Sequence, residues 1–211
     1  MSSNTIQELS EIFKRFPGIG PRQAKRFVYF LLQQDRAGID KFLRLVGDLS
    51  RYISQCSACQ CFFQSQNGNT NTLCPICRDE ARYNGQLLIV EKDADLDSLE
   101  KAGGHQGVYF VLGGLVPILE KEPARRIRMD LLQKRIADLV TKQKLSEIVI
   151  ALAATVEADH TAEFLKLNLA TLAEKTPFKI SVLGRGLSGG LEIEYSDPET
   201  LKSALSNRHL L

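Results

Sequence analysis

The chain has 211 residues, of which 44% are hydrophobic and 25% are charged, so its composition is that of a globular protein with room for more than one domain. Its apolar runs fall short of the roughly 18 residues that a membrane-spanning helix needs, and we expect no membrane partner. The net charge is only +2, but residues 1–55 carry nine Lys or Arg against five Asp or Glu, which makes this part the candidate to bind a polyanion.

Three helices are predicted at the amino terminus, because apolar residues recur there at helical spacing. They span residues 5–15, 22–33 and 38–53. Together they are expected to form a small helical domain over residues 1–53.

The turn between the first two helices has the sequence Pro-Gly-Ile-Gly-Pro. Gly18 and Gly20 lack a Cβ, so their backbone N–H groups can approach a phosphate closely, and the positive end of the next helix adds to the attraction. Ile19 is expected to anchor the turn in the core. The second helix begins with the basic residues Arg22, Lys25 and Arg26. This pattern favours sequence-independent contacts to DNA phosphates, while a plain interhelical turn remains the alternative.

Two C-x-x-C pairs, separated by 14 residues, occupy the polar segment 54–80. They consist of Cys56, Cys59, Cys74 and Cys77. The spacing is typical of a structural four-thiolate zinc site, so we expect one Zn²⁺ per chain, which would replace the apolar core that this segment lacks. Disulfides are the alternative, but the amino terminus has no secretory pattern, and disulfides are rare in the cytoplasm where we expect this protein. Cys61 fits neither pair and is interpreted as a small side chain.

From residue 81 onward, short apolar runs alternate with helical patterns, which is typical of a parallel sheet covered by helices. The expected strands are 86–91, 107–114, 147–154 and 178–184. The expected helices fall near 95–101, 125–143 and 160–174. The fold class is therefore multidomain α/β, and a carboxyl-terminal segment is expected to pack on the sheet domain or on a neighbouring subunit.

Five segments, taken in order, resemble the RecR family of bacterial recombination mediators over nearly the whole chain. They are FPGIGPRQAKRFVYFLL, the four cysteines, LIVEKDADLDSLEKAGGHQGVYFVLGGLVPILE, TVEADHTAEFL and GRGLSGGLEIEYSDPETLKSAL. The resemblance implies a helix-hairpin-helix module at 1–53, a zinc finger at 54–80, a Toprim domain with a parallel sheet at 81–175, and a carboxyl-terminal extension at 176–211.

The resemblance also implies a function in DNA repair and recombination. It implies a non-enzymatic, DNA-binding factor that acts with RecO or RecF to load RecA onto single-stranded DNA coated by SSB. It further implies a ring-like homo-oligomer, expected to be a tetramer, in the cytoplasm and at the nucleoid when it acts. On the matching hairpin positions, Arg22 and Arg26 are the expected DNA contacts, and Lys25 is the weaker candidate.

A metal-dependent Toprim nuclease or topoisomerase is the alternative function. Such enzymes hold Mg²⁺ on a Glu that follows one strand and on an Asp-x-Asp that follows a later one. Glu91 occupies the first position here, but Ala153 and Thr155 replace the two aspartates. The family commonly has Asn where this chain has Ala153, so the segment departs further. Glu157 and Asp159 remain nearby without completing a cluster, and we expect no enzymatic activity.

Three charged residues are candidates for partner binding: Glu91, Glu157 and Arg185. Glu91 is equally consistent with an exposed carboxylate at a strand end. The acidic run 91–100 either begins a helix or receives a basic partner such as RecO. Arg185 is interpreted as an interface residue, with a second phosphate contact as the alternative. A purely structural zinc-containing interaction module is disfavoured by the basic hairpin.

Overall fold

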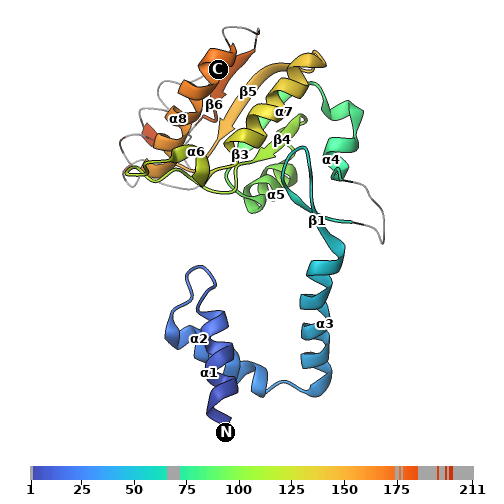
Figure 1. Cartoon of the computed structure of the whole chain (residues 1–211), viewed down its shortest axis with the longest axis vertical. Helices are drawn as coiled ribbons and strands as arrows, with labels where there is room; N and C mark the ends of the chain where they lie inside the picture. Colours follow the sequence, from blue (N-terminus) through green and yellow to red (C-terminus); the bar gives the residue numbers. More distant parts are fainter. Residues whose placement is uncertain are drawn as a thin grey trace. The chain divides into compact units, whose positions relative to one another are not determined.

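The computed structural model describes residues 2–65, 72–173, 176, 178–184, 194, 198, 200 and 201. The chain divides into two compact units, Met1–Ile53 and Ser54–Leu211 (Figure 1). No helix within the described ranges is both long and apolar enough to cross a membrane.

The first unit contains the three expected helices. They are α1 (Ser2–Phe13), α2 (Pro21–Leu32) and α3 (Arg36–Tyr52). The core of the unit consists of the buried side chains of Phe13, Ala24 and Val28, which come from α1 and α2. Asp35 caps α3, because its carboxylate accepts a hydrogen bond of 2.8 Å from the amide of Gly38.

The second unit is built on a four-stranded sheet in which every neighbouring pair is parallel, as the sequence predicts. Its strands are β3 (Gly85–Val90), β4 (Val108–Val111), β5 (Leu145–Ala151) and β6 (Lys179–Val182). The strand order is β4-β3-β5-β6, so β4 and β6 are its edges. Since strands of a parallel sheet need crossover connections, helices lie between successive strands along the chain.

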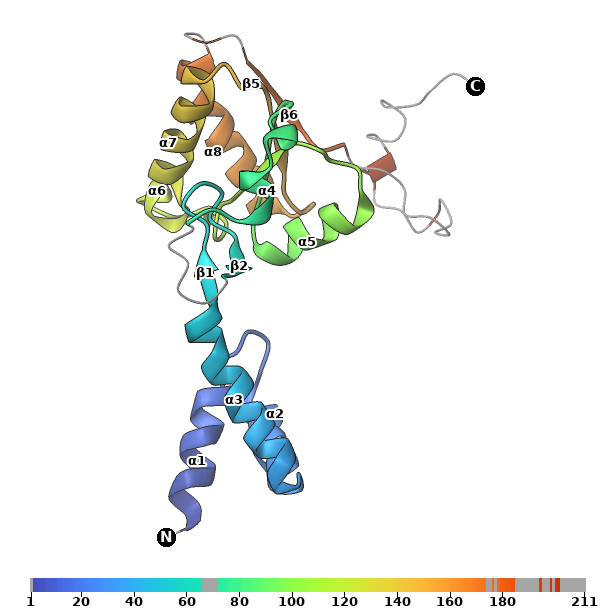
Figure 2. The same cartoon turned by 90° about the vertical axis from the view of Figure 1, so that its right-hand side faces the viewer.

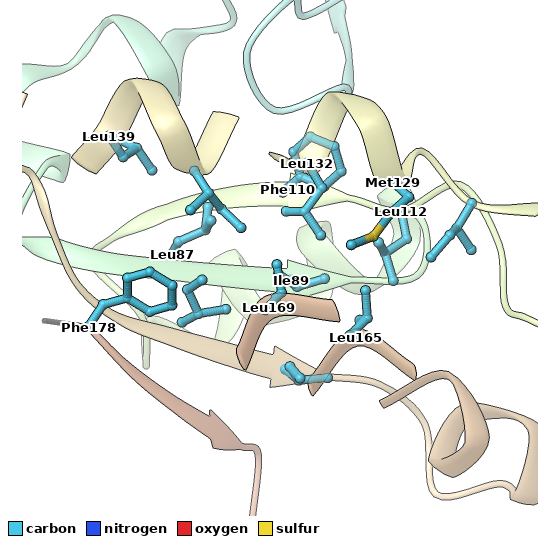
Figure 3. Close-up of a cluster of buried hydrophobic side chains, with 14 of the residues drawn as sticks. Leu87, Ile89, Phe110, Leu112, Met129, Leu132, Leu139, Leu165, Leu169 and Phe178 are labelled. Atoms are coloured by element: carbon cyan, nitrogen blue, oxygen red, sulfur yellow. The ribbon is translucent and has the colours of Figure 1, made fainter. Parts of the chain in front are cut away.

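Helices cover both faces of this sheet (Figure 2). Leu87 and Ile89 point to one face, where they join a core with α7 (Met129–Thr141) and α8 (Val156–Ala173) (Figure 3). The neighbouring residues Leu88 and Val90 point to the other face, because side chains alternate along a strand. That second face is covered by α5 (Asp93–Ala102) and by the segment that holds the four cysteines.

The cysteine-bearing segment consists of short elements. They are β1 (Ile53–Gln55), β2 (Phe62–Gln64), α4 (Pro75–Arg78) and a 3₁₀ turn at Glu80–Arg82. β1 and β2 form a two-stranded sheet of their own. The amide of Phe62 donates a hydrogen bond of 2.7 Å to Asp93 Oδ1, which joins this segment to the start of α5.

One expected helix is divided in the structure. The sequence predicts a single helix near 125–143, but a short helix, α6 (Pro123–Arg126), is separated from α7. The break occurs at Ile127, which has an extended backbone with φ −129° and ψ 166°. The amide of Arg128 then donates a hydrogen bond of 3.0 Å to the carbonyl of Leu112, just after β4. A long-range backbone contact therefore competes with the local helical pattern. Most of the expected carboxyl-terminal extension, 176–211, lies outside the described residues.

Candidate functional site

The glycine turn of the first unit is held by its central residue. Gly18 has a positive φ of 74°, a conformation that glycine adopts without a steric penalty. The next amide, that of Ile19, donates a hydrogen bond of 3.1 Å to the carbonyl of Phe16. The Ile19 side chain packs against the α1–α2 core. The turn is therefore anchored from inside, and its glycines lie toward solvent.

The amino-terminal end of α2 is open to an anion. Gly20 is the N-cap residue with an extended backbone, Pro21 follows as the first helical residue, and no side chain caps this end. A Cβ built on Gly20 meets no described atom within 4 Å. The first amides of a helix lack partners inside it and lie at the positive end of its dipole, so an anion such as phosphate suits this place.

Three exposed cations stand on the first turns of α2. Arg22 lies three residues before Lys25 and four before Arg26, so all three share one side of the helix. Among the residues that the structure describes, none of the three forms an ion pair. Their charge is therefore available to an external polyanion, on the same helix end as the open amides.

The second unit gathers four cysteine sulfurs into one buried cluster. The Sγ atoms of Cys56, Cys59, Cys74 and Cys77 all lie within 4.8 Å of one another. Sulfur atoms bound to the same tetrahedral Zn²⁺ lie about 3.8 Å apart, because each Zn–S bond is about 2.3 Å long. The Sγ atoms of Cys59 and Cys74 are 3.6 Å apart, which fits that geometry. The donor set and its burial suit a closed structural metal site.

Local backbone geometry produces this convergence. After the first C-x-x-C pair the chain reverses through Gln60, which has a positive φ of 66° and donates its amide to the carbonyl of Cys56 at 2.9 Å. In the second pair, Cys74 is the N-cap of α4, and its sulfur accepts a hydrogen bond of 3.5 Å from the amide of Cys77. Each pair therefore directs two sulfurs toward one point.

The thiols of the cluster compete with one another for ionisation. Hydrogen bonds from Cys59 and the other sulfurs lower the pKa of the Cys56 thiol, whereas the bond to Cys56 raises the pKa values of Cys61 and Cys77. Ionising one thiol therefore makes its neighbours harder to ionise. A bound metal cation removes this conflict, because a coordinated thiol loses its proton outright.

Sequence analysis missed two contacts of the cluster. Arg135 of α7 is buried, and its Nη2 lies 3.9 Å from the sulfur of Cys77. Cys61, interpreted from sequence as a plain small residue, is also buried, and its sulfur lies 3.3 Å from that of Cys59. The fifth cysteine is thus part of the cluster. The only feature of the sequence that could have indicated this contact is that Cys61 lies two residues after Cys59.

At the sheet edge that follows β3 and β5, Glu91 is present but Ala153 and Thr155 stand where the two aspartates of a Mg²⁺-binding enzyme are expected. Val90 and Ala151 are paired in register, so Glu91 and Ala153 follow neighbouring strands at the same edge of the sheet. Thr155, in the second aspartate position, receives a hydrogen bond of 3.2 Å from the amide of Ala158. Within the described part of the chain, the cysteines form the only group of three or more metal-ligating side chains.

Two of the three candidate partner-binding residues lie in the described part of the chain. Glu91 is half-buried, and its carbonyl accepts a hydrogen bond of 2.9 Å from the amide of Gly113. Glu157 is exposed in the first turn of α8. Arg185 lies outside the described residues.

Comparisons with known proteins cover both units. The family described as "RecR, helix-hairpin-helix" matches residues 6–47, and the family described as "Toprim domain" matches residues 85–184. Curated relatives of the chain carry the name "Recombination protein RecR". The protein from Cereibacter sphaeroides is 35% identical over 205 residues, covering 96% of this chain and 95% of its own length. The Legionella pneumophila protein is 32% identical over 211 residues, covering 100% of this chain and 99% of its own length. The Chromobacterium violaceum protein is 34% identical over 203 residues, covering 96% of each chain.

Proposed function

Because the chain belongs to the RecR family and so serves as a recombination mediator in DNA repair, we propose that it acts as a non-enzymatic DNA-binding protein. We propose four functional segments: the DNA-binding hairpin at 1–53, a zinc finger at 54–80, the Toprim domain at 81–175 and a carboxyl-terminal segment at 176–211. The observation that carries the proposal is the open, basic end of α2.

DNA binding is proposed to occur through backbone amides of the Gly18-Ile19-Gly20 turn and through the side chains of Arg22 and Arg26, with Lys25 contributing less. Such contacts go to phosphates, so they are independent of sequence and weaken as salt rises. The support for this assignment is the coincidence of uncapped amides and unpaired cations on one helix end.

The test is DNA affinity measured over a range of salt concentrations for the double variant Arg22→Ala/Arg26→Ala. We expect weaker binding to every sequence and a salt dependence reduced by about one unit of slope per lost phosphate contact. The matched control is Arg36→Ala, which removes an exposed arginine of the same unit that lies beside Asp40. Equal affinity and slope for the double variant and the control would refute the assignment.

We propose that the protein has no nuclease or topoisomerase activity. The reason lies at the sheet edge where Toprim enzymes hold Mg²⁺. Ala153 and Thr155 provide no carboxylate beside Glu91, so a catalytic metal lacks two of its ligands. The nuclease or topoisomerase alternative is therefore not favoured. We expect labelled DNA to remain uncut and its supercoiling unchanged when it is incubated with the pure protein and Mg²⁺. Cleavage that copurifies with the protein, and that Glu91→Gln abolishes, would establish the enzyme instead.

The metal of the cysteine cluster is proposed to be one structural Zn²⁺ per chain. Four thiolates are the usual donor set of closed zinc sites, and a site without an open position supplies stability and no reactive water. Metal analysis of the purified protein is expected to give one zinc per chain, and Cys74→Ser is expected to lose it. A protein purified with its thiols reduced but without metal would contradict the zinc assignment.

Self-association is proposed to use α3. Phe42, Val46 and Leu49 recur on one side of this helix, and their side chains are 42%, 50% and 61% exposed. A soluble helix seldom leaves such a stripe without a partner, and a second copy of this unit offers the matching apolar surface. Together with the family resemblance this supports a ring-like homo-oligomer, which we propose to be a tetramer. Mass measurement in solution should show that Val46→Glu/Leu49→Glu lowers the oligomeric state.

Specific partners follow from the family resemblance and remain proposals. We propose that the protein acts with RecO or RecF, and through them on RecA and on DNA coated by SSB. Glu91, Glu157 and Arg185 are the proposed partner-binding residues. Because the proposed ligand is DNA, the proposed place of action is the cytoplasm, at the nucleoid when the protein acts. Binding of purified RecO or RecF to the wild-type protein and to Glu91→Gln, measured side by side, tests the first of these residues.

A further inference from the structure

We propose that Arg135 is a positioning and charge-compensating residue of the metal site. Its guanidinium donates a hydrogen bond to the metal-bound sulfur of Cys77 and so strengthens metal binding by the four thiolates. This inference rests on the proposed metal site. It assigns a role to a buried arginine that lies 58 residues after Cys77, outside the two C-x-x-C pairs.

Arg135 is buried where its positive charge has little compensation from carboxylates. Its side chain is only 6% exposed, and its Nη1 lies 3.5 Å from Oδ2 of Asp138. That carboxylate is 43% exposed and also pairs with Lys142 at 2.8 Å. The Nε of Arg135 has no hydrogen-bond partner among the described residues. The guanidinium therefore needs an anion inside the protein, because a buried charge without a close counter-charge is strongly destabilising.

The sulfur cluster supplies that anion when it is loaded with metal. The Nη2 of Arg135 lies 3.9 Å from the Sγ of Cys77, which is a member of the four-sulfur group. Four thiolates around one divalent ion leave a net charge of two minus at a buried place. The arginine and the loaded cluster therefore compensate each other, and hydrogen bonds between charged groups are stronger than those between neutral ones.

Tyr83 holds the guanidinium beside the sulfur. Its hydroxyl donates a hydrogen bond of 2.9 Å to the carbonyl of Cys77 and accepts one of 3.4 Å from Nη2 of Arg135. The guanidinium carbon also lies 5.5 Å from the centroid of the Tyr83 ring, which is within the range of a cation–π contact. Arg135 belongs to α7, so these contacts connect the second C-x-x-C pair to a helix of the parallel-sheet domain.

The experiment compares Co²⁺ binding by the reduced full-length wild type, Arg135→Met and Arg135→Lys. Methionine keeps an unbranched side chain without the charge, and lysine keeps the charge. Loss of a residue that hydrogen-bonds to a metal ligand commonly weakens metal binding about 10- to 100-fold, and we expect this for Arg135→Met. Its sulfur-to-cobalt charge-transfer band should also move to longer wavelength, because a sulfur without this hydrogen bond gives up an electron more easily. Arg135→Lys should restore part of both properties.

The matched control is Asp138→Asn, which removes the exposed partner of Arg135 and leaves the contact with sulfur in place. It should equal wild type in affinity and in band position. A charge-transfer band that stays in place in Arg135→Met, whatever the affinity, would show that Arg135 acts only through packing and would overturn the inference, while the metal site stands. If wild type does not bind Co²⁺ through thiolates at all, the proposed metal site fails, and the inference fails with it.

A second measurement does not depend on the folding of a variant. In the wild-type protein loaded with ¹¹³Cd²⁺, nuclear magnetic resonance detects scalar coupling between the ion and protons that are hydrogen-bonded to its sulfur ligands. The amide of Cys77, which donates to the Sγ of Cys74 at 3.5 Å, is the internal control. A further coupled signal is expected from the guanidinium of Arg135. Coupling to the Cys77 amide without coupling to Arg135 would refute the hydrogen bond.

Discussion

The amide of Val111 donates a hydrogen bond of 2.8 Å to the carbonyl oxygen of Cys59. Val111 ends β4, an edge strand of the sheet, so the backbone of a proposed metal ligand is bonded directly to that edge. An exposed edge strand invites pairing with other chains, and covering it avoids that outcome. The cysteine cluster is thus attached to the sheet by its backbone, although the polar composition of its sequence is that of a separate loop.

Arg128 is expected to be essential for this attachment. Its Nη1 donates hydrogen bonds to the carbonyl of Val111 at 3.0 Å and to that of Gln60 at 3.2 Å, which bridges β4 and the cysteine turn. Arg128→Ala leaves both carbonyls without their charged donor, so we expect a loss of about 2 kcal/mol in the free energy of unfolding of the metal-loaded protein. Urea denaturation measures it.

The control for this variant is Arg125→Ala, which removes an exposed arginine paired with Glu122. Exposed ion pairs contribute between about 0 and 1 kcal/mol, so the control should unfold nearly as wild type does. A loss for Arg128→Ala no larger than that of the control would show that the bridge is unimportant.

Variants of the two glycines in the hairpin turn are expected to have different effects: one should lower the stability of the first unit, and the other should weaken DNA binding. Gly18 has a φ of +74°, which costs an alanine about 1 kcal/mol or more, so Gly18→Ala should destabilise the first unit.

Gly20 has an ordinary extended backbone at an N-cap, where serine is favourable, so Gly20→Ser should leave stability unchanged. If phosphate approaches the amides here, Gly20→Ser nevertheless weakens DNA binding. Thermal unfolding and DNA titration of both variants decide this, and unaltered DNA affinity for Gly20→Ser would argue against close backbone contact.

Removal of Phe13 is expected to unfold the first unit. Its ring is 9% exposed and meets the ring of Phe27 edge-on, with centroids 5.7 Å apart. Phe13→Ala should cost about 3 kcal/mol, because a small core has few other contacts to compensate for the cavity. Circular dichroism should show a loss of helix content, and DNA titration should show a loss of DNA binding. Phe16→Ala, which truncates a half-exposed ring next to it, is the control and should fold; equal effects of the two variants would contradict the role given to Phe13.

Acid is expected to weaken the contact between Arg82 and Glu100 in the second unit. Burial, the largest single effect, raises the pKa of Glu100. The hydrogen bonds from Arg82, at 2.5 and 3.2 Å, lower it, and together with the charge of Arg82 and the effect of Tyr109 they outweigh burial, so the folded pKa lies below the ordinary value. The stabilisation is therefore complete above the unfolded pKa, about 4.3, and is lost as the pH falls through the lower folded value.

The matching measurement is the melting temperature of wild type and Glu100→Gln as a function of pH. The variant should melt lower at pH 7, and the gap should close on acidification. Glu122→Gln, which alters an exposed pair, is expected to show a small and constant gap. A gap for Glu100→Gln that persists at the acid end would show that the carboxylate charge is not what stabilises this contact.

Several features were predictable from sequence because their signals are local. The three amino-terminal helices follow from apolar spacing and from the prolines around the Gly18–Gly20 turn, and the parallel sheet follows from apolar runs that alternate with helices. The two C-x-x-C pairs predicted the sulfur cluster, since each pair needs only its own turn to converge. The absence of an Asp-x-Asp after β5 was visible as Ala153 and Thr155.

The tertiary structure alone decided how these parts are joined. The bridge made by Arg128, the approach of Arg135 to Cys77 and the division of one predicted helix into α6 and α7 all depend on residues far apart in the chain. No pattern in a short window encodes such contacts, because they arise only when separate elements compete for the same hydrogen bonds and the same buried space. Sequence thus determined most of the elements and the convergence of the four paired cysteines, and packing determined what each of them touches.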